Sequence, residues 1–185
     1  MINITFPDGT IKEFNEGVTG IQIAESISEG LARATLAIKF NDKLIDATIP
    51  LSQDGTIQLI TFKDEEGVEV FRHSSAHLLA HAVQRLYPEA KPTIGPVVEQ
   101  GFYYDFDNLT ISDKDFSAIE AEMKKIVKEK IEIKRIDYSN KEEALGDFVT
   151  NTFKEEMIND IQENWSAYEQ GDFKDLCRGP HVPNT

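Results

Sequence analysis

The chain has 185 residues, 40% hydrophobic and 9% aromatic, which is enough for one or two soluble globular domains. Its formal net charge of −14 at pH 7 excludes a protein that wraps nucleic acid by electrostatics alone, because phosphates are neutralised by Lys and Arg. The sequence has no apolar run of the roughly 20 residues that span a bilayer, no signal-peptide pattern and one cysteine. We therefore expect a cytoplasmic protein without membrane contacts or internal disulfides.

Residues 1–62 are predicted to form a compact unit of strands with one helix. Apolar and polar residues alternate in the strand segments, as they do when one face of a sheet is buried. Thr19, followed by Gln22 three residues later, is a capping-box signal for the start of a helix that Gly30 should end. In chain order we expect a hairpin at 2–6 and 11–14, the helix, and strands at 35–40 and 56–61. Such a small mixed sheet with a helix across one face is typical of ubiquitin-like folds.

The charged stretch at 63–70 contains a glycine and is predicted to mark a domain boundary, with residues 63–185 forming a second domain. Beyond it, a helix should carry His73 and His77 and end before Pro88. This helix places two imidazoles one turn apart at the start of the second domain.

The rest of the second domain alternates short strands and helices. Ser112 or Asp113 should cap an amphipathic helix, whereas 151–158 looks less regular and the acidic stretch up to 170 has no clear pattern. The expected elements are turns and short strands at 91–106, a helix at 115–130, a strand at 131–138 and a short helix at 140–150. Together the two domains predict an α+β fold.

An aromatic run at 102–106 includes two adjacent tyrosines. In an extended segment neighbouring side chains point to opposite faces, so Tyr103 and Tyr104 should face different surroundings. We expect one of these tyrosines to line a pocket and to offer its hydroxyl to a ligand.

A group of basic residues interrupts the acidic trend. Two interpretations stay open: the solvated face of an amphipathic helix, which is the commoner case, and a contact with a phosphate backbone. The group consists of Lys124, Lys125, Lys128, Lys130, Lys134 and Arg135.

Two short stretches far apart in sequence carry the strongest chemical signal: HSSAH at 73–77 and CRGPH at 177–181. If the first is helical, both of its imidazoles lie on one face. The second puts the single thiol four residues before another imidazole. Brought together, His73, His77, Cys177 and His181 match a tetrahedral zinc set of nitrogen and sulfur ligands.

Three other interpretations of these residues stay open. The imidazoles, with Lys154 and Asp175, could hold and activate water for acid–base chemistry. Cys177 could be a nucleophile activated by His181, although no oxyanion donor can be identified. The histidines could also be packed side chains. For His81, one turn further along, we expect either packing or support of a residue of the site.

HSSAH and CRGPH, with IGPVVEQGFYYDF between them and a strand-helix unit before them, resemble the N-terminal part of bacterial-type threonyl-tRNA synthetases. The resemblance covers essentially the whole chain. It implies a TGS domain with a ubiquitin-like β-grasp fold at 1–62 and, at 63–185, an α+β editing domain of the type shared with alanyl-tRNA synthetases.

The implied activity is hydrolysis of serine wrongly esterified to threonine tRNA. A site that selects threonine rejects serine through one methyl group only, worth roughly 1–3 kcal/mol, so a second site is needed to remove the error. The resemblance assigns catalytic roles to five residues and substrate contacts to three. The catalytic set is His73, Lys154, Asp175, Cys177 and His181, and the substrate set is His77, Tyr103 and Tyr104.

The resemblance also bears on cofactors and partners. Threonyl-type editing is described as metal-free, so zinc at the four-residue set becomes the alternative to metal-free hydrolysis. The chain stops at Thr185, where relatives continue into a catalytic domain that uses ATP and zinc, and into domains that form a homodimer. We therefore expect serine-charged threonine tRNA as partner and no aminoacylation. A structural zinc module or a tRNA-binding module without hydrolytic activity is the other reading.

Overall fold

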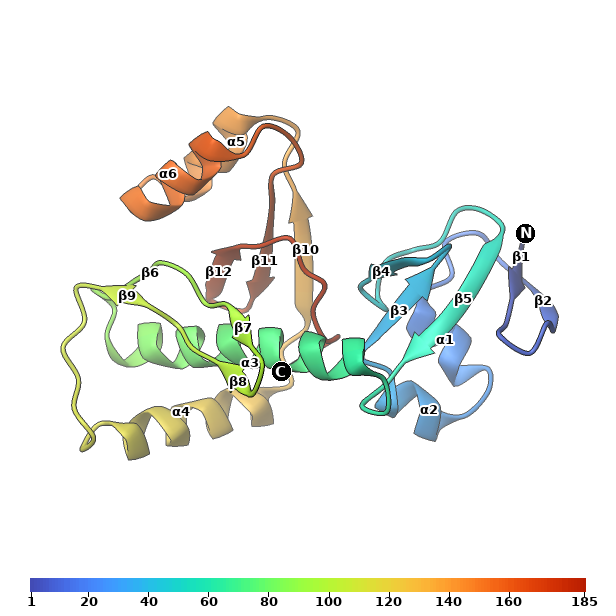
Figure 1. Cartoon of the computed structure of the whole chain (residues 1–185), viewed down its shortest axis with the longest axis horizontal. Coiled ribbons are helices and arrows are strands. Elements are labelled where there is room, and N and C mark those ends of the chain that lie inside the picture. Colours follow the sequence, from blue (N-terminus) through green and yellow to red (C-terminus); the bar gives the residue numbers. More distant parts are fainter. The chain divides into compact units, whose positions relative to one another are not determined.

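The computed structural model describes all residues from 1 to 185 and confirms the α+β class (Figure 1). The chain divides into two compact units, a first unit of residues 1–71 with 179–183 and a second unit of 72–178 with 184–185. The division at 71/72 falls inside helix α3 (Glu65–Leu86), so most of the stretch predicted as a boundary is helical. A domain boundary at 62/63 stays a prediction. None of the helices has the length and apolar character that a membrane span requires.

The first unit is built on a five-stranded sheet in the order β2-β1-β5-β3-β4. The first strand lies beside the last one and runs parallel to it, while its other neighbour is the antiparallel partner of the predicted hairpin. The strands are β1 (Ile2–Thr5), β2 (Ile11–Phe14), β3 (Ala37–Phe40), β4 (Lys43–Ile45) and β5 (Gly55–Ile60). Ile4, Ile23 and Ile38 are fully buried between this sheet and its helical layer. This is the predicted ubiquitin-like arrangement.

The single helix predicted for the first unit is wrong, because two short helices stand there: α1 (Gly20–Glu25) and α2 (Glu29–Ala34). The capping box of Thr19 is present as predicted, but Gly30 lies inside α2 instead of ending a helix. The Ser26 hydroxyl donates to the Ile23 carbonyl, and the Ser28 side chain accepts from the first turn of α2. Serine side chains compete with continued helical hydrogen bonding in this way and favour a new N-cap.

The second unit has a three-stranded antiparallel sheet in the order β10-β11-β12, with helices on both faces (Figure 1). α3 and α4 share one apolar cluster around Val83 and Ile126, and α5 and α6 share another around Phe148 and Ile158. The strands are β10 (Ile133–Asp137), β11 (Ser166–Gln170) and β12 (Phe173–Leu176), and the further helices are α4 (Phe116–Glu129), α5 (Lys141–Asp147) and α6 (Thr152–Asp160). Two small ladders pair β6 (Lys91–Pro92) with β9 (Phe106–Asp107), and β7 (Val97–Val98) with β8 (Gly101–Phe102).

Two expectations for the second unit are wrong. Neither Ser112 nor Asp113 caps α4; the N-cap is Asp115, whose carboxylate instead accepts from the backbone and hydroxyl of Ser112. The stretch 151–158, expected to be irregular, forms most of α6, whose N-cap Asn151 accepts from the Lys154 amide. Asn is a strong N-cap residue, and this signal was overlooked in the sequence.

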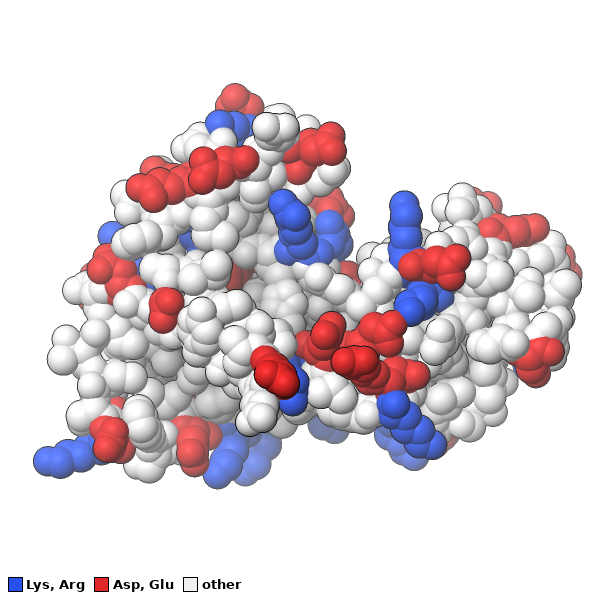
Figure 2. All heavy atoms as spheres, in the orientation of Figure 1, with Lys and Arg blue, Asp and Glu red and all other residues white.

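The grouped basic residues of the second unit lie on α4, at its C-cap and on β10. Figure 2 shows acidic side chains gathered over α5 and α6 on the face that it presents. Five of the six grouped basic residues are exposed, and the sixth, Arg135, is half-buried against Tyr168 and Asp137. The three lysines on α4 agree with a solvated helix face, whereas Lys134 and Arg135 lie on β10, and a phosphate contact of the group stays a prediction.

Candidate active site

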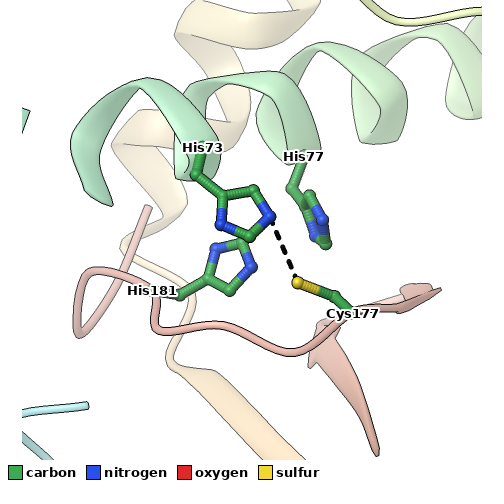
Figure 3. A group of neighbouring side chains, drawn as sticks. All are labelled: His73, His77, Cys177 and His181. Atoms are coloured by element: carbon green, nitrogen blue, oxygen red, sulfur yellow. Dashed lines mark hydrogen bonds between the residues drawn. The ribbon is translucent and has the colours of Figure 1, made fainter. Parts of the chain in front are cut away.

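The thiol of Cys177 lies against the first histidine of the HSSAH stretch. His73 Nε2 is 3.1 Å from Cys177 Sγ, the thiol follows directly after β12, and both side chains are half-buried (Figure 3). The Cys177 amide donates to the Ser166 carbonyl at 3.1 Å, and the Ser166 hydroxyl donates to the Cys177 carbonyl at 2.7 Å. Burial lowers the pKa of His73, with the charge of Asp175 partly opposing this effect. The ring is therefore neutral at physiological pH.

His77 lies one turn further along α3 and is 3% exposed. Its ring stands edge-on to the His73 ring at 5.2 Å between centroids, and its Nε2 is 3.6 Å from an Asp175 carboxylate oxygen. Burial lowers the pKa of His77 to about 4 in spite of that carboxylate. At neutral pH the site therefore offers a second uncharged imidazole that can hold water or a hydroxyl group.

Asp175 is the centre of a buried polar group. Its carboxylate is 2.6 Å from Lys154 Nζ, and it accepts a hydrogen bond from the Tyr104 hydroxyl. Asp175 and Lys154 are 3% and 2% exposed, so this is a fully desolvated ion pair. Burial and the neighbouring carboxylate raise the pKa of Tyr104, so the phenol stays protonated and donates.

Two side-chain contacts fix the lysine that α6 brings into this group. Lys154 Nζ also donates to the Thr93 carbonyl at 2.7 Å, and the Asn151 side chain donates to the Pro92 carbonyl at 2.8 Å. The N-terminus of α6 is thus tied to the β6 segment. The ammonium is held in one position, which suits a charge that must orient a ligand.

The two tyrosines face different surroundings, as the alternation of an extended segment predicts. Tyr104 points to Asp175, whereas Tyr103 is 49% exposed. Gly95 allows the Tyr104 ring to approach the backbone, because a Cβ at this position would stand 2.2 Å from Tyr104 Cδ2.

Replacing Gly95 with alanine should displace the Tyr104 ring and destabilise the fold by about 1–3 kcal/mol, the usual cost of overpacking. Gly146 is a matched control in helix α5, because a Cβ there would meet no atom within 4 Å. Gly146→Ala should stabilise the fold by about 0.5–1 kcal/mol, since alanine is the better helix former. Urea unfolding of the two variants measures both effects, and equal stabilities would contradict this description of Gly95.

The fourth residue of the predicted ligand set follows a cis Gly179–Pro180 bond. The His181 side chain is buried, and its backbone N–H donates to Asp46 at 2.7 Å. The ligand atoms of His73, His77, Cys177 and His181 all lie within 4.8 Å of one another, as Figure 3 shows for their side chains. Three imidazoles and a thiol form a donor set that could bind a metal ion such as zinc.

The sequence reasoning missed a group of charged residues at the far end of the same helix face. His81 is 1% exposed and lies between Gln170 and Asp172, and Arg85 contacts the same aspartate. The hydrogen bonds from the Arg85 guanidinium lower the pKa of Asp172, and the hydrogen bond with His81 lowers it further. The i, i+4, i+8 spacing of His73, His77 and His81 was the available signal. It could not reveal the partners, which are 87–91 positions away in sequence.

Two cavities border the site. One of about 410 Å³ opens beside Cys177 and is lined by the end of α6, the following loop and Ser166. The other, of about 220 Å³, borders Lys154 and Asp175 from the side of α5. Both the thiol and the buried ion pair are therefore next to space that solvent or a small ligand can enter.

Comparisons with known proteins cover the whole chain. Residues 2–61 match the family model of the TGS domain, and residues 165–185 match that of the threonyl and alanyl tRNA synthetase second additional domain. The chain is 52% identical over 186 aligned residues to a threonine–tRNA ligase of Desulforapulum autotrophicum and 51% identical over 187 to one of Staphylococcus carnosus. All of this chain is aligned, but it spans only 29% of the length of each relative. The chain thus carries a TGS domain and a second-additional-domain segment, and it is homologous over its whole length to the N-terminal region of bacterial threonine–tRNA ligases.

Proposed function

We propose that this chain is the editing part of a threonine–tRNA ligase and hydrolyses the ester between serine and threonine tRNA. One observation carries the proposal: the buried Lys154–Asp175 ion pair lies next to two uncharged imidazoles and a thiol, in a chain homologous to such ligases. A desolvated ion pair is costly unless good geometry and further hydrogen bonds compensate for the lost hydration, and imidazoles whose pKa values are lowered by burial are typical of catalytic sites. The proposed partner is therefore serine-charged threonine tRNA.

The side chains divide the work of hydrolysis according to their charge. Asp175 accepts from the serine ammonium, and Lys154 stabilises the negative charge that develops on the carbonyl oxygen of the ester when water attacks. His73, neutral and in contact with Cys177, holds the water or a hydroxyl of the terminal ribose, accepts the proton of the attacking water and returns it to the ribose oxygen when the ester bond breaks. Tyr104 keeps the Asp175 carboxylate in place, and Cys177 with His181 completes the wall of the pocket.

Serine is distinguished from threonine by size. Asp175, which borders the cavity of about 220 Å³, and His77 are each 3% exposed, so this part of the wall is closely packed and does not yield to the extra methyl of threonine. A buried wall rejects an added methyl by overpacking, while serine hydroxyl and ammonium groups are retained by hydrogen bonds.

The test is release of labelled serine from threonine tRNA by this chain and by a ligase that contains it. Release of serine should exceed both the uncatalysed rate and release of threonine by about 100-fold or more. Tyr103→Ala is a matched control for Tyr104→Phe, since the exposed tyrosine has no contact with Asp175. Tyr104→Phe should slow serine release and Tyr103→Ala should not. Absence of serine release by both proteins would overturn the proposal.

A second candidate function, a zinc site, is favoured by the close approach of the four nitrogen and sulfur ligand atoms. Metal-free editing is preferred here because Lys154 and Asp175 already supply the charges that hydrolysis needs. Elemental analysis of the purified chain decides between the two. Stoichiometric zinc, together with unfolding by a chelator, would support a structural metal site. Serine release that is undiminished in EDTA would support metal-free hydrolysis. ATP binding and dimerisation are proposed only for the remaining domains of such a ligase.

A further inference from the structure

Helix α3 and the segment formed by strand β12 and the following Cys177 meet in three successive pairs of side chains. Every fourth residue of the helix meets every second residue of the strand, and the two elements run in opposite directions. The pairs are His81 with Phe173 (ring centroids 5.5 Å apart), His77 with Asp175 (3.6 Å) and His73 with Cys177 (3.1 Å).

This pairing is possible because four residues of the helix and two residues of the strand advance by nearly the same distance. Four residues of an α-helix advance about 6 Å, and two residues of a strand advance about 6.7 Å. The side chains of the two elements therefore stay in register over three pairs. A slip of one strand residue would turn Asp175 and Cys177 to the opposite face of the sheet, away from α3. The distances at the candidate active site depend on this register.

The first pair fixes the register, because His81 is bonded on both sides. Its Nδ1 is 3.1 Å from the Gln170 amide nitrogen, which can only donate, so Nε2 carries the proton and donates to Asp172 at 2.7 Å. The ring also stacks on Phe173 with an interplanar angle of 17°. Gln170, Asp172 and Phe173 surround the β11–β12 turn, so His81 holds the start of β12.

Arg85 extends this attachment to a third element. Its guanidinium contacts Asp172 at 2.9 Å and forms two hydrogen bonds of 2.8 and 3.0 Å with Glu129 of α4. A further contact of 3.3 Å reaches Glu122. Such bidentate, charge-assisted bonds hold geometry better than single hydrogen bonds. The β11–β12 turn is thus fastened to both α3 and α4.

We propose that His81, Arg85 and Asp172 are positioning residues for the candidate active site: they set the register between α3 and β12, and thereby the approach of His73 to Cys177 and of His77 to Asp175. None of the three belongs to the groups proposed to hold serine or water. The catalytic part of this inference depends on the proposed function, but the structural part does not. A misplacement of about 1 Å at an active site can cost roughly 100-fold in rate.

Asp172→Asn is the most direct test, because the Asp172 side chain is 64% exposed and its replacement leaves the apolar cores intact. We expect kcat for serine release to fall about 10- to 100-fold with little change in KM. Arg85→Lys keeps the positive charge but loses the planar guanidinium that binds two carboxylates at once, and kcat should fall in the same way. The double variant should be no worse than the more severe single variant, because the two residues act as one unit.

A second measurement needs no tRNA. Cys177 is the only cysteine of the chain, so its rate of alkylation by iodoacetamide reports its contact with His73. Asp172→Asn and Arg85→Lys should shift this rate in the same direction as His73→Gln does. Lys174→Gln is the control, because Lys174 lies on the opposite face of β12 and pairs with Asp147 of α5. This control should leave both the alkylation rate and serine release unchanged.

The outcomes separate the two proposals. If the melting temperature falls in Asp172→Asn and Arg85→Lys while kcat and the alkylation rate stay at the wild-type values, these residues only stabilise the fold and the inference is wrong. If the wild-type chain releases no serine, the proposed function fails, and the alkylation rates alone then decide whether His81, Arg85 and Asp172 set the register.

Discussion

Lys154→Met should destabilise the folded chain by about 3–5 kcal/mol, the usual cost of leaving a buried charge without its partner. Asp175 is 3% exposed. Its carboxylate forms one ion pair with a lysine or arginine side chain, the pair with the Lys154 ammonium 2.6 Å away. Methionine keeps most of the volume of the lysine side chain but supplies no charge. Urea unfolding at pH 7 measures the difference, with Lys174→Met, which breaks a partly exposed ion pair, as the matched control.

Removing both charges should separate stability from activity. In the double variant Lys154→Met, Asp175→Asn no buried charge is left, and the amide can still accept from the Tyr104 hydroxyl. Stability should therefore recover by at least about half of the loss, because a buried ion pair and a neutral replacement are often nearly equivalent. Serine release should stay at least about 100-fold below wild type, as for the loss of an electrostatic stabiliser. A single variant as stable as wild type would contradict the buried pair.

The free energy of unfolding should fall as the pH is lowered from 6.5 towards 4. Burial lowers the pKa of His77 from 6.5 to about 4, so in this window the unfolded chain binds a proton that the folded chain does not. The folded state should lose about 3 kcal/mol, from a change of about 2.5 in pKa at about 1.4 kcal/mol each. Burial also lowers the pKa values of His73 and His81, which steepens the loss. Above pH 7 these groups contribute no slope.

Urea unfolding between pH 7 and pH 4 in the presence of EDTA measures this dependence. His77→Gln is the control, because glutamine keeps a polar side chain without titrating in this range. Between pH 6.5 and 4, the unfolding free energy of this variant should depend less steeply on pH than that of the wild type. The difference corresponds to up to about one fewer proton taken up on unfolding. Parallel curves for the wild type and the variant would show that His77 does not titrate with a lowered pKa.

The fold could be predicted from the sequence where it depends on local signals, such as apolar–polar alternation and helix caps. The hairpin of β1 and β2, the capping box of Thr19 and the α+β class were predicted, because each depends on residues within a few positions of one another. The break between α1 and α2 was missed. Side-chain hydrogen bonds of Ser26 and Ser28 favour ending one helix and starting the next, but the free-energy difference from one continuous helix is small. Helix α6 was missed because its polar residues conceal the apolar period, although Asn151 was a usable start signal.

The candidate site was predictable by residue type and not by contact. HSSAH and CRGPH identified His73 and Cys177, which the structure brings to 3.1 Å. Lys154 was predicted as a charge that helps to activate water, but its burial could not be predicted, because it follows from the tertiary position of α6. For His81 the sequence predicted packing or support of the site but not its partners, since Asp172 and Gln170 come from a hairpin about 90 positions later. Contacts of this range depend on the register between α3 and β12, which no local pattern encodes.

The most direct measurement of the central claim is single-turnover release of serine from threonine tRNA, in EDTA, by the wild-type chain and by the folded double variant Lys154→Met, Asp175→Asn. The proposal predicts release of serine but not threonine by the wild type, and a loss of at least about 100-fold in a variant that still unfolds cooperatively. Equal rates for the two proteins would contradict the claim that the Lys154–Asp175 pair and its neighbours on α3 and β12 form the hydrolytic site.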